Sequence, residues 1–302
     1  MEYNSSKKEK LSLKVIFLGN HTVGVRTLRV LASYANVVGV VAHPSDPEDG
    51  HAYESVFQTA NKLKLPVIRA SGRSDEVKSF ISRFMPDIIW ITDYKYILPT
   101  SILKIPRIGT INLHPSLLPK YRGRAPINWA IINGEKNLGL TAHWVDGGMD
   151  TGDIIYQYAY ELSQQEDVSD ALKKLYPLYE EITETIIKEL ASSKRINATR
   201  QNHAVSSSFP KRSPKDGKIN WEQSAINIWN LVRAVAPPYP GAFGELNGGT
   251  IYIHKISSIL PFGKDSYSPG SIVSGSISDS EIVISCGDGN IVVTNFDFQF
   301  NP

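Results

Sequence analysis

The strongest constraint on the fold of this chain is the alternation, over its first two-thirds, of short apolar runs with amphipathic segments. Short apolar runs are typical of buried strands, and strands that alternate with helices predict βα units and a mainly parallel sheet. The expected strands cover residues 13–18, 37–42, 66–69, 87–92, 109–112, 140–145 and 153–160. The expected helices between them cover residues 25–33, 52–63, 74–84 and 126–133.

A longer helix is expected over residues 168–192. Apolar side chains recur there at steps of three and four residues, which predicts one buried face. They are Leu172, Leu175, Tyr179, Ile182, Ile186 and Leu190. Pro177 lies inside this pattern and has no amide hydrogen, so it predicts either a kink or a displaced helix start.

The character of the sequence changes after residue 193. Residues 194–218 are polar and contain several serines and prolines, which is typical of a linker, and a helix is expected over 221–236. Short strands joined by tight turns at 247–249 and 288–290 then predict a small barrel. The predicted parts are a flexible tail (1–12), a first domain (13–193), the linker (194–218) and a β-rich domain (219–302). The expected fold class is α/β: a Rossmann-like, mainly parallel sheet domain followed by a smaller, β-barrel-like C-terminal domain.

Composition excludes several classes of protein. The 302 residues carry a formal net charge of +2, which is too small to indicate a nucleic acid or a membrane as partner. The single cysteine, Cys286, excludes an intrachain disulfide, and no apolar run approaches the roughly 18 residues of a membrane span. The polar start of the chain lacks the apolar segment of a signal peptide. We therefore expect a cytoplasmic protein.

The segment with the most chemistry runs from residue 109 to 153. Asn112 and His114 are two residues apart at the carboxyl end of an expected strand, so their side chains emerge on the same side. An amide can stabilise an oxyanion, an imidazole can take a proton near neutral pH, and a carboxylate can orient that imidazole. These are the groups that acyl transfer to an amine requires. Spacing does not choose among Asp146, Asp150 and Asp153, and His114 before Pro115 is also compatible with a loop anchor.

The same segment resembles the signature of the folate-dependent formyltransferases. The matching stretches are 112–119 (NLHPSLLP), 121–123 (YRG), His143 and 150–152 (DTG), and the likeness extends from about Lys14 to Phe243. This family includes glycinamide ribonucleotide and methionyl-tRNA formyltransferases, sugar N-formyltransferases and the formyltransferase domain of the lipid A aminoarabinose pathway. The resemblance implies that Asn112, His114 and Asp150 form the catalytic trio, with Asp150 orienting His114. It also implies 10-formyltetrahydrofolate as the co-substrate.

The resemblance further implies two stretches that bind the folate. One is the segment after the fourth strand, with Tyr94, Tyr96, Ile97 and Leu98, and the other is the turn with Asp146, Gly147, Gly148 and Met149. Glycines without a Cβ let the backbone approach a flat ring closely, although such a pair is also an ordinary turn. Arg124 and Arg122 are candidates for a phosphate or carboxylate, because arginine pairs with both in a bidentate way. We assign Arg124 to the folate and Arg122 to the acceptor.

The other residues assigned to the acceptor are Ser116, Tyr121, Trp229 and Tyr239. The aromatic pair is placed for stacking on a sugar or base, although an aromatic residue at a helix end more often packs in a core. No group of histidines has the spacing of a metal site, so no metal is predicted.

The nature of the amine is argued from charge. Residues 204–302 contain seven Lys and Arg and eight Asp and Glu, a balance of −1, where a tRNA-binding module would carry a basic face. Residues 43–50 (HPSDPEDG) are acidic, whereas methionyl-tRNA formyltransferases carry a basic insertion there. The stretches 118–126 (LPKYRGRAP), 229–234 (WNLVRA) and 238–243 (PYPGAF) resemble the aminoarabinose and amino-sugar enzymes. We therefore expect a nucleotide-linked deoxyamino sugar as acceptor, destined for a surface polysaccharide.

Two alternatives stay open. A methionyl-tRNA formyltransferase would share the C-terminal barrel. A formyltetrahydrofolate hydrolase would share the trio but has an extra N-terminal regulatory domain, which residues 1–12 are too few to form. A folate- or sugar-binding protein without activity is disfavoured by the complete trio. The C-terminal barrel also offers a surface for the contacts of a homodimer, and the sequence leaves the oligomeric state open.

Overall fold

A computed structural model describes residues 11–44, 53–193, 196–263 and 267–300. The predicted tail over 1–12 therefore lies almost wholly outside the described residues. The chain divides into two compact units. Unit 1 comprises Met1–Arg122, Gly139–Ala159 and Lys174–Ser207, and unit 2 comprises Gly123–Leu138, Tyr160–Lys173 and Ser208–Pro302. The domain boundaries given above stay predictions.

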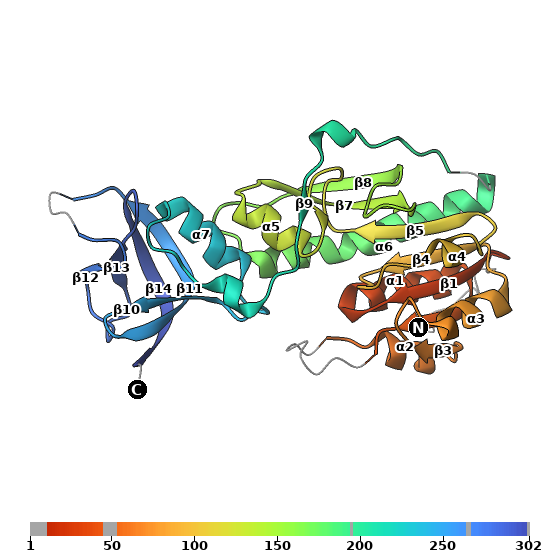
Figure 1. Cartoon of the computed structure of the whole chain (residues 1–302), viewed down its shortest axis with the longest axis horizontal. Helices are drawn as coiled ribbons and strands as arrows, with labels where there is room; N and C mark the ends of the chain where they lie inside the picture. The colour runs from red at the N-terminus through yellow and green to blue at the C-terminus, as the bar shows by residue number, and fades with distance from the viewer. Residues whose placement is uncertain (1–10, 45–52, 194–195, 264–266, 301–302) are drawn as a thin grey trace, which may run out of the picture. The chain divides into compact units, whose positions relative to one another are not determined.

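A seven-stranded sheet forms the centre of unit 1, with the order β3-β2-β1-β4-β5-β7-β8 (Figure 1). The pairs β2–β3, β1–β2, β1–β4 and β4–β5 are parallel, and β5–β7 is antiparallel. The strands are β1 (Lys14–Gly19), β2 (Asn36–Ala42), β3 (Val67–Arg69), β4 (Ile88–Thr92), β5 (Gly109–His114), β7 (Asn137–Trp144) and β8 (Ile154–Glu161). The predicted mainly parallel, Rossmann-like sheet is confirmed.

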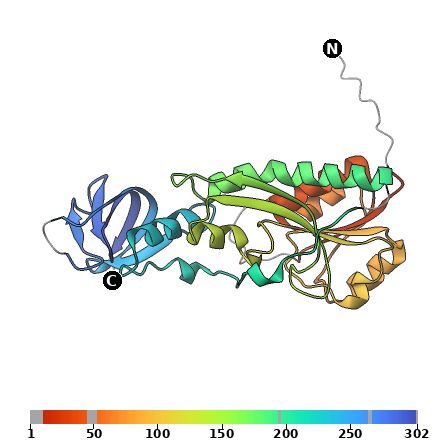
Figure 2. The same ribbon diagram turned by 90° about the horizontal axis from the view of Figure 1, so that it is seen from above.

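Helices cover both faces of this sheet. Helices α1 and α6 share one face, where Arg26 pairs with Glu180 at 2.8 Å and Tyr34 donates to Glu184 at 2.6 Å, and α3 and α4 lie on the other face (Figure 2). The helices are α1 (His21–Tyr34), α2 (Val56–Lys62), α3 (Asp75–Phe84), α4 (Thr100–Leu103) and α6 (Val168–Ser193). Trp90 and Tyr179 are the largest fully buried side chains.

Helix α6 begins at Val168, so the displaced start that Pro177 predicted is wrong. Asp167 explains this start, because its carboxylate accepts from the backbone N–H groups of Ser169 and Asp170 at 2.7 and 3.2 Å. Pro177 is exposed, and the helix continues through it. Of the residues predicted for its buried face, all but the half-buried Leu172 are buried.

Unit 2 contains a five-stranded antiparallel sheet of order β10-β11-β14-β13-β12. Its strands are β10 (Ala242–Leu246), β11 (Gly249–Leu260), β12 (Ile272–Ser274), β13 (Ile282–Ser285) and β14 (Asn290–Phe300), and both predicted turns join neighbouring strands. Helices α5 (Pro126–Ile132) and α7 (Ala225–Ala234) complete it. Helix α7 begins four residues later than expected, because the Ser224 side chain accepts from the Asn227 N–H and caps it.

Residues 196–217 contain three short elements. The pair β6 (Arg122–Gly123) and β9 (Ser208–Phe209) forms a two-stranded sheet, and η2 (His203–Val205) and η3 (Pro214–Gly217) are single 3₁₀ turns. Thr199 exchanges two backbone hydrogen bonds of 2.8 Å with Ile154 at the start of β8. This stretch therefore adds ordered backbone to the edge of the seven-stranded sheet. None of the helices within the described ranges is long and apolar enough to cross a membrane.

The two isoleucines Ile81 and Ile97 provide a test of the unit 1 core. Ile81 is fully buried in the cluster around Val77, Ile89 and Leu98, whereas Ile97 is 59% exposed. We expect Ile81→Ala to lower the free energy of unfolding by about 2–5 kcal/mol, and Ile97→Ala to change it by less than about 0.5 kcal/mol. Urea unfolding of both variants measures this. Equal losses would contradict the described packing.

Candidate active site

The polar side chains of the predicted trio meet where β5 and β7 lie side by side. Asn112 and His114 occupy alternate positions at the carboxyl end of β5, and Asn112 is paired with His143 of β7 in the strand register. Asp150 follows in the turn after β7. Its Oδ2 lies 3.7 Å from His114 Nδ1, and its Oδ1 lies 3.6 Å from His143 Nε2. The structure thus brings Asn112, His114 and Asp150 together and adds His143 between them.

Hydrogen bonds assign the protons of both imidazoles. His114 Nε2 lies 2.8 Å from the carbonyl oxygen of Tyr121, and His143 Nδ1 lies 2.8 Å from that of Trp144. A carbonyl oxygen only accepts, so both of these nitrogens donate. The opposite nitrogens then carry lone pairs when the rings are neutral. Asn112 Nδ2 accordingly donates to His143 Nε2 at 3.1 Å, which fixes the orientation of the Asn112 amide.

Burial sets the protonation of His114. The side chain is 6% exposed, and desolvation lowers its pKa from the ordinary 6.5, as does the neighbouring His143, against the opposing effects of the Asp150 carboxylate and the Tyr121 carbonyl. The imidazole is therefore neutral at physiological pH, with the Nδ1 lone pair turned towards Asp150. A neutral base beside a carboxylate can accept a proton and be stabilised as the imidazolium.

The turn from Asp146 to Gly152 gives Asp150 its position. The Asp146 carboxylate accepts from the Gly148 N–H at 2.9 Å and from the Thr151 hydroxyl at 2.5 Å, so this aspartate closes the turn. Asp150 has a left-handed backbone with φ 54°, which is costly for a residue with a side chain. At Gly152 a Cβ would lie 1.8 Å from the Trp144 carbonyl oxygen, so only glycine fits.

The residues predicted to bind folate divide into buried and exposed groups. Leu98 belongs to the unit 1 core, and the Tyr94 hydroxyl donates to the Ala70 carbonyl at 2.7 Å. By contrast, Ile97 and Met149 are 59% and 53% exposed, which is unusual for apolar side chains of this size. A Cβ at Gly147 would meet nothing within 4 Å, whereas one at Gly148 would meet Thr151. The half-buried Tyr96 lies against His43, with ring centroids 5.3 Å apart.

The predicted acceptor residues make contacts within their own units. Ser116 is buried and donates to the Lys120 carbonyl at 2.8 Å, and Tyr121 is 7% exposed. Arg122 is 6% exposed and donates to Gln201 and His203. In unit 2, Trp229 lies in the core, and the partly buried Tyr239 packs against this core. Their assignment to a substrate stays a prediction.

Arg124, predicted to bind folate, belongs to unit 2 and is exposed. Its backbone N–H donates to the Phe209 carbonyl at 3.0 Å. The role of its guanidinium in binding folate stays a prediction.

Three residues that support the site were not predicted from the sequence. Gln201 is 4% exposed and donates to the carbonyl oxygens of Asp150 and Gly152, and the Ser207 hydroxyl accepts from the Tyr121 N–H at 2.9 Å. His43 accepts from the Lys95 N–H at 2.9 Å and so holds the segment that follows β4. Gln201 and Ser207 lie in a polar stretch with no periodicity, so no local signal identified them.

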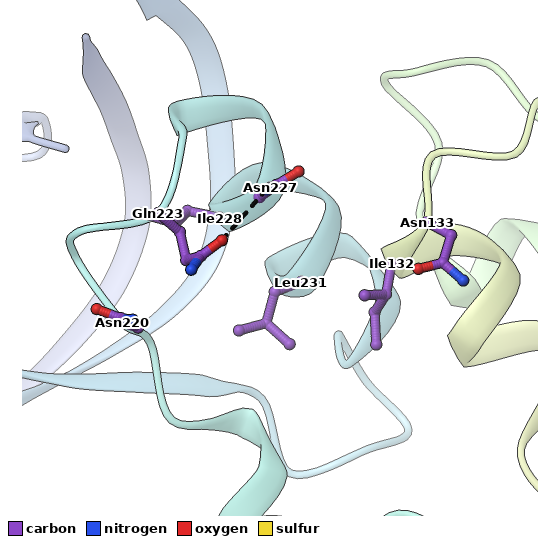
Figure 3. Close-up of a pocket in the computed structure, with 7 residues that line it drawn as sticks. All are labelled: Ile132, Asn133, Asn220, Gln223, Asn227, Ile228 and Leu231. Atoms are coloured by element: carbon purple, nitrogen blue, oxygen red, sulfur yellow. Dashed lines mark hydrogen bonds between the residues drawn. The ribbon is translucent and has the colours of Figure 1, made fainter. Parts of the chain in front are cut away.

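Unit 2 has a separate hollow of about 390 Å³ between α5 and α7 (Figure 3). Its rim carries the amides of Asn133, Asn220, Gln223 and Asn227 over Ile132, Ile228 and Leu231, and no predicted site residue lines it. Within the described ranges, no three His, Cys, Asp or Glu side chains gather as metal ligands would.

Family models match both parts of the chain. The formyl transferase model matches residues 13–184, and the model of the formyl transferase C-terminal domain matches residues 211–300. The chain belongs to the formyl transferase family. It is therefore an enzyme, and the expected family is confirmed.

Two curated relatives differ in the reaction that their names state. The chain is 38% identical over 282 residues to the bifunctional polymyxin resistance protein ArnA of Wigglesworthia glossinidia brevipalpis, with 91% of the chain but only 41% of that protein covered. It is 33% identical over 293 residues to the methionyl-tRNA formyltransferase of Geobacter metallireducens, with 95% and 91% covered. The chain thus spans about two-fifths of the first relative's length.

Solved structures share the fold. An N-formyltransferase from Helicobacter canadensis, solved with folinic acid and dTDP-3-aminofucose, superposes with a TM-score of 0.71 at 20% identity, covering 94% of this chain and all of the other. WlaRD, a sugar 3N-formyl transferase, gives 0.70 at 19% identity, covering 94% and 97%.

The lowered pKa of His114 predicts a pH dependence of stability. In the unfolded chain His114 takes up a proton near pH 6.5, whereas in the folded chain it does so only at lower pH. As pH falls through 6.5, protonation therefore favours the unfolded chain, and the free energy of unfolding decreases. We expect wild type to lose up to about 1.4 kcal/mol more per pH unit than His114→Gln in this window. Urea unfolding between about pH 5.5 and 7.5 measures it. Parallel profiles would contradict a buried, neutral His114.

Proposed function

We propose that this enzyme transfers the formyl group of 10-formyltetrahydrofolate to the amine of a nucleotide-linked amino sugar. The observation that carries the reaction is the meeting of Asn112, His114 and Asp150 at the carboxyl end of β5, in a chain of the formyl transferase family. The two structural neighbours described above, one with folinic acid and the other with 5-N-formyl-THF, support the folate.

The geometry suits each step of this transfer. The amine nitrogen attacks the formyl carbon, and the carbonyl electron pair moves onto oxygen. Asn112 uses one amide N–H for His143 and offers the second to this oxyanion. The amine proton passes to His114 Nδ1, and Asp150 stabilises the imidazolium that forms. The bond from the formyl carbon to N10 of the folate then breaks, and N10 receives the proton from His114.

Charge in unit 2 supports a small acceptor. Two of its arginines make contacts within the unit, which makes their charge less available to a polyanion. Arg233 is 7% exposed and donates to the carbonyls of Ser163 and Glu166. Lys218, which pairs with Glu245 at 2.8 Å, stays 58% exposed. Arg212 lies over the Trp129 ring at 4.7 Å and donates to the Asp216 carbonyl.

Methionyl-tRNA is the second candidate acceptor. It is favoured by the 33% identity to a methionyl-tRNA formyltransferase across 91% of that protein's length. The internal engagement of basic side chains in unit 2 opposes it. Only an assay with both acceptors separates the two.

The assay combines the protein with 10-formyltetrahydrofolate and a panel of nucleotide-linked 3- and 4-amino deoxysugars, with methionyl-tRNA and buffer alone beside them. We expect one sugar to gain a formyl group, seen by product mass together with release of tetrahydrofolate. His114→Ala should lower kcat by about 10²–10⁴-fold, because it removes the base. His254→Ala is the matched control, since His254 pairs with Asp297 at 2.9 Å in unit 2, away from the trio in sequence. It should retain activity.

If only methionyl-tRNA is formylated, the acceptor is the tRNA and the proposed sugar is wrong. If the folate turns over in buffer alone, the reaction is hydrolysis and the proposed transfer is wrong. Full activity of His114→Ala would overturn the assignment of the base.

The exposed apolar side chains at the folate stretches give a second prediction. Covering Ile97 or Met149 by a flat ring removes apolar surface from water, which favours binding. We expect Ile97→Ala and Met149→Ala each to raise KM for 10-formyltetrahydrofolate by about tenfold with kcat retained. Met85→Ala is the control, because Met85 is 73% exposed at the end of α3. If KM for 10-formyltetrahydrofolate is unchanged in both variants, Ile97 and Met149 do not contribute to folate binding.

A further inference from the structure

We infer that Gln201 and Arg122 are positioning residues that hold the Asp150 carboxylate at its distance from the His114 imidazole. Neither residue is placed at the reacting atoms. Both act through hydrogen bonds to the backbone or side chain of a neighbour. The inference rests on the proposed function only in taking His114 and Asp150 as catalytic.

Gln201 holds the backbone of the turn that carries Asp150. Its Nε2 donates to the Asp150 carbonyl at 2.9 Å and to the Gly152 carbonyl at 2.7 Å. Asp150 is in the left-handed region, and such a conformation persists only where surrounding contacts enforce it. Gln201 is 4% exposed, so both carbonyls would lose a buried donor without it.

Arg122 fixes the orientation of the Gln201 amide. Its terminal nitrogen donates to Gln201 Oε1 at 2.6 Å and also to His203 Nδ1 at 2.9 Å. A guanidinium only donates, so the amide oxygen must face Arg122 and the amide nitrogen must face the turn. The charge of the donor strengthens this bond in a buried setting, because Arg122 is 6% exposed.

The two residues close a ring of contacts around the catalytic pair. Tyr121, the neighbour of Arg122, accepts from His114 Nε2, and the N–H groups of Tyr121 and Arg122 both donate to Ser207 at 2.9 Å. Arg122 donates to Gln201, and Gln201 donates to the backbone carbonyl of Asp150. The Asp150 carboxylate lies 3.7 Å from His114, which completes the ring. A shift of Tyr121 or of the Asp150 backbone therefore changes the distance between the His114 imidazole and the Asp150 carboxylate.

A role in folding alone is the competing explanation, and a double-mutant cycle separates the two. Gln201→Leu removes the amide. If Gln201 acts through Asp150, the loss of the Gln201 amide should change kcat little in a protein in which Asp150→Asn has already removed the carboxylate. Asn128 is the matched control, because it is 5% exposed and its Nδ2 also donates to a backbone carbonyl, that of Ala234 in unit 2, but not to the turn of Asp150.

We expect Gln201→Leu to lower kcat for the best acceptor of the panel by about 10–100-fold, with both KM values within about twofold. Gln201→Leu with Asp150→Asn should be within about threefold of Asp150→Asn alone. Asn128→Leu should instead combine with Asp150→Asn multiplicatively. Gln201→Glu keeps an acceptor for Arg122 but loses the donor, so it should match Gln201→Leu and serves if the leucine variant does not fold. A multiplicative loss for Gln201 would overturn the inference.

A second measurement needs no acceptor. The pKa of His114, followed by NMR of its ring in the unliganded protein, senses the carboxylate of Asp150, which raises it, and His143, which lowers it. We expect Gln201→Leu to lower this pKa and Asn128→Leu to leave it unchanged. A pKa that Gln201→Leu leaves at the wild-type value would overturn the inference. If the pKa falls while His114→Ala still transfers formyl groups, the positioning role stands and the proposed base fails.

Discussion

The hydrogen bond from His114 Nε2 to the Tyr121 carbonyl, 2.8 Å long, is the contact on which the rest of the site depends. It places the proton of the neutral imidazole away from Asp150 and leaves a lone pair at Nδ1. With the opposite tautomer, Nδ1 would donate to the carboxylate and no base would face the site. The loop that supplies this carbonyl is itself held by Ser116, which donates to the Lys120 carbonyl, and by Thr141, which donates to Ser116.

Much of the fold was predictable because its signals are local. Buried strands and one-sided helices impose a period on the sequence, and the strands and helices predicted for unit 1 occur in the predicted order, with the unpredicted four-residue helix α4 between β4 and β5 in addition. Other differences lie at helix starts, where a single capping side chain decides. Asp167 starts α6 well before Pro177, and Ser224 starts α7 after Trp221, whose ring nitrogen donates to the Glu245 carbonyl instead. Such choices depend on one hydrogen bond, which a hydrophobic pattern does not encode.

The site was predictable only in part. The strand period placed Asn112 and His114 together, but it did not choose among Asp146, Asp150 and Asp153, and in the structure their side-chain contacts distinguish Asp150 from Asp146. Asp146 closes a turn, whereas Asp150 is left-handed and faces both histidines. The support from Gln201 comes from 51 residues further along the chain, so it follows from the tertiary fold and not from any local pattern.

That long-range support bears on how modular this family can be. The segment from 196 to 207 is polar and outwardly resembles a spacer, yet it supplies Gln201 to the turn of Asp150 and Ser207 to Tyr121. The catalytic fold is therefore not self-contained at the end of α6. A chimera that exchanges C-terminal regions between relatives with different acceptors should therefore be joined after Ser207. An earlier junction would combine the Asp150 turn of one protein with the Gln201 and Ser207 positions of another.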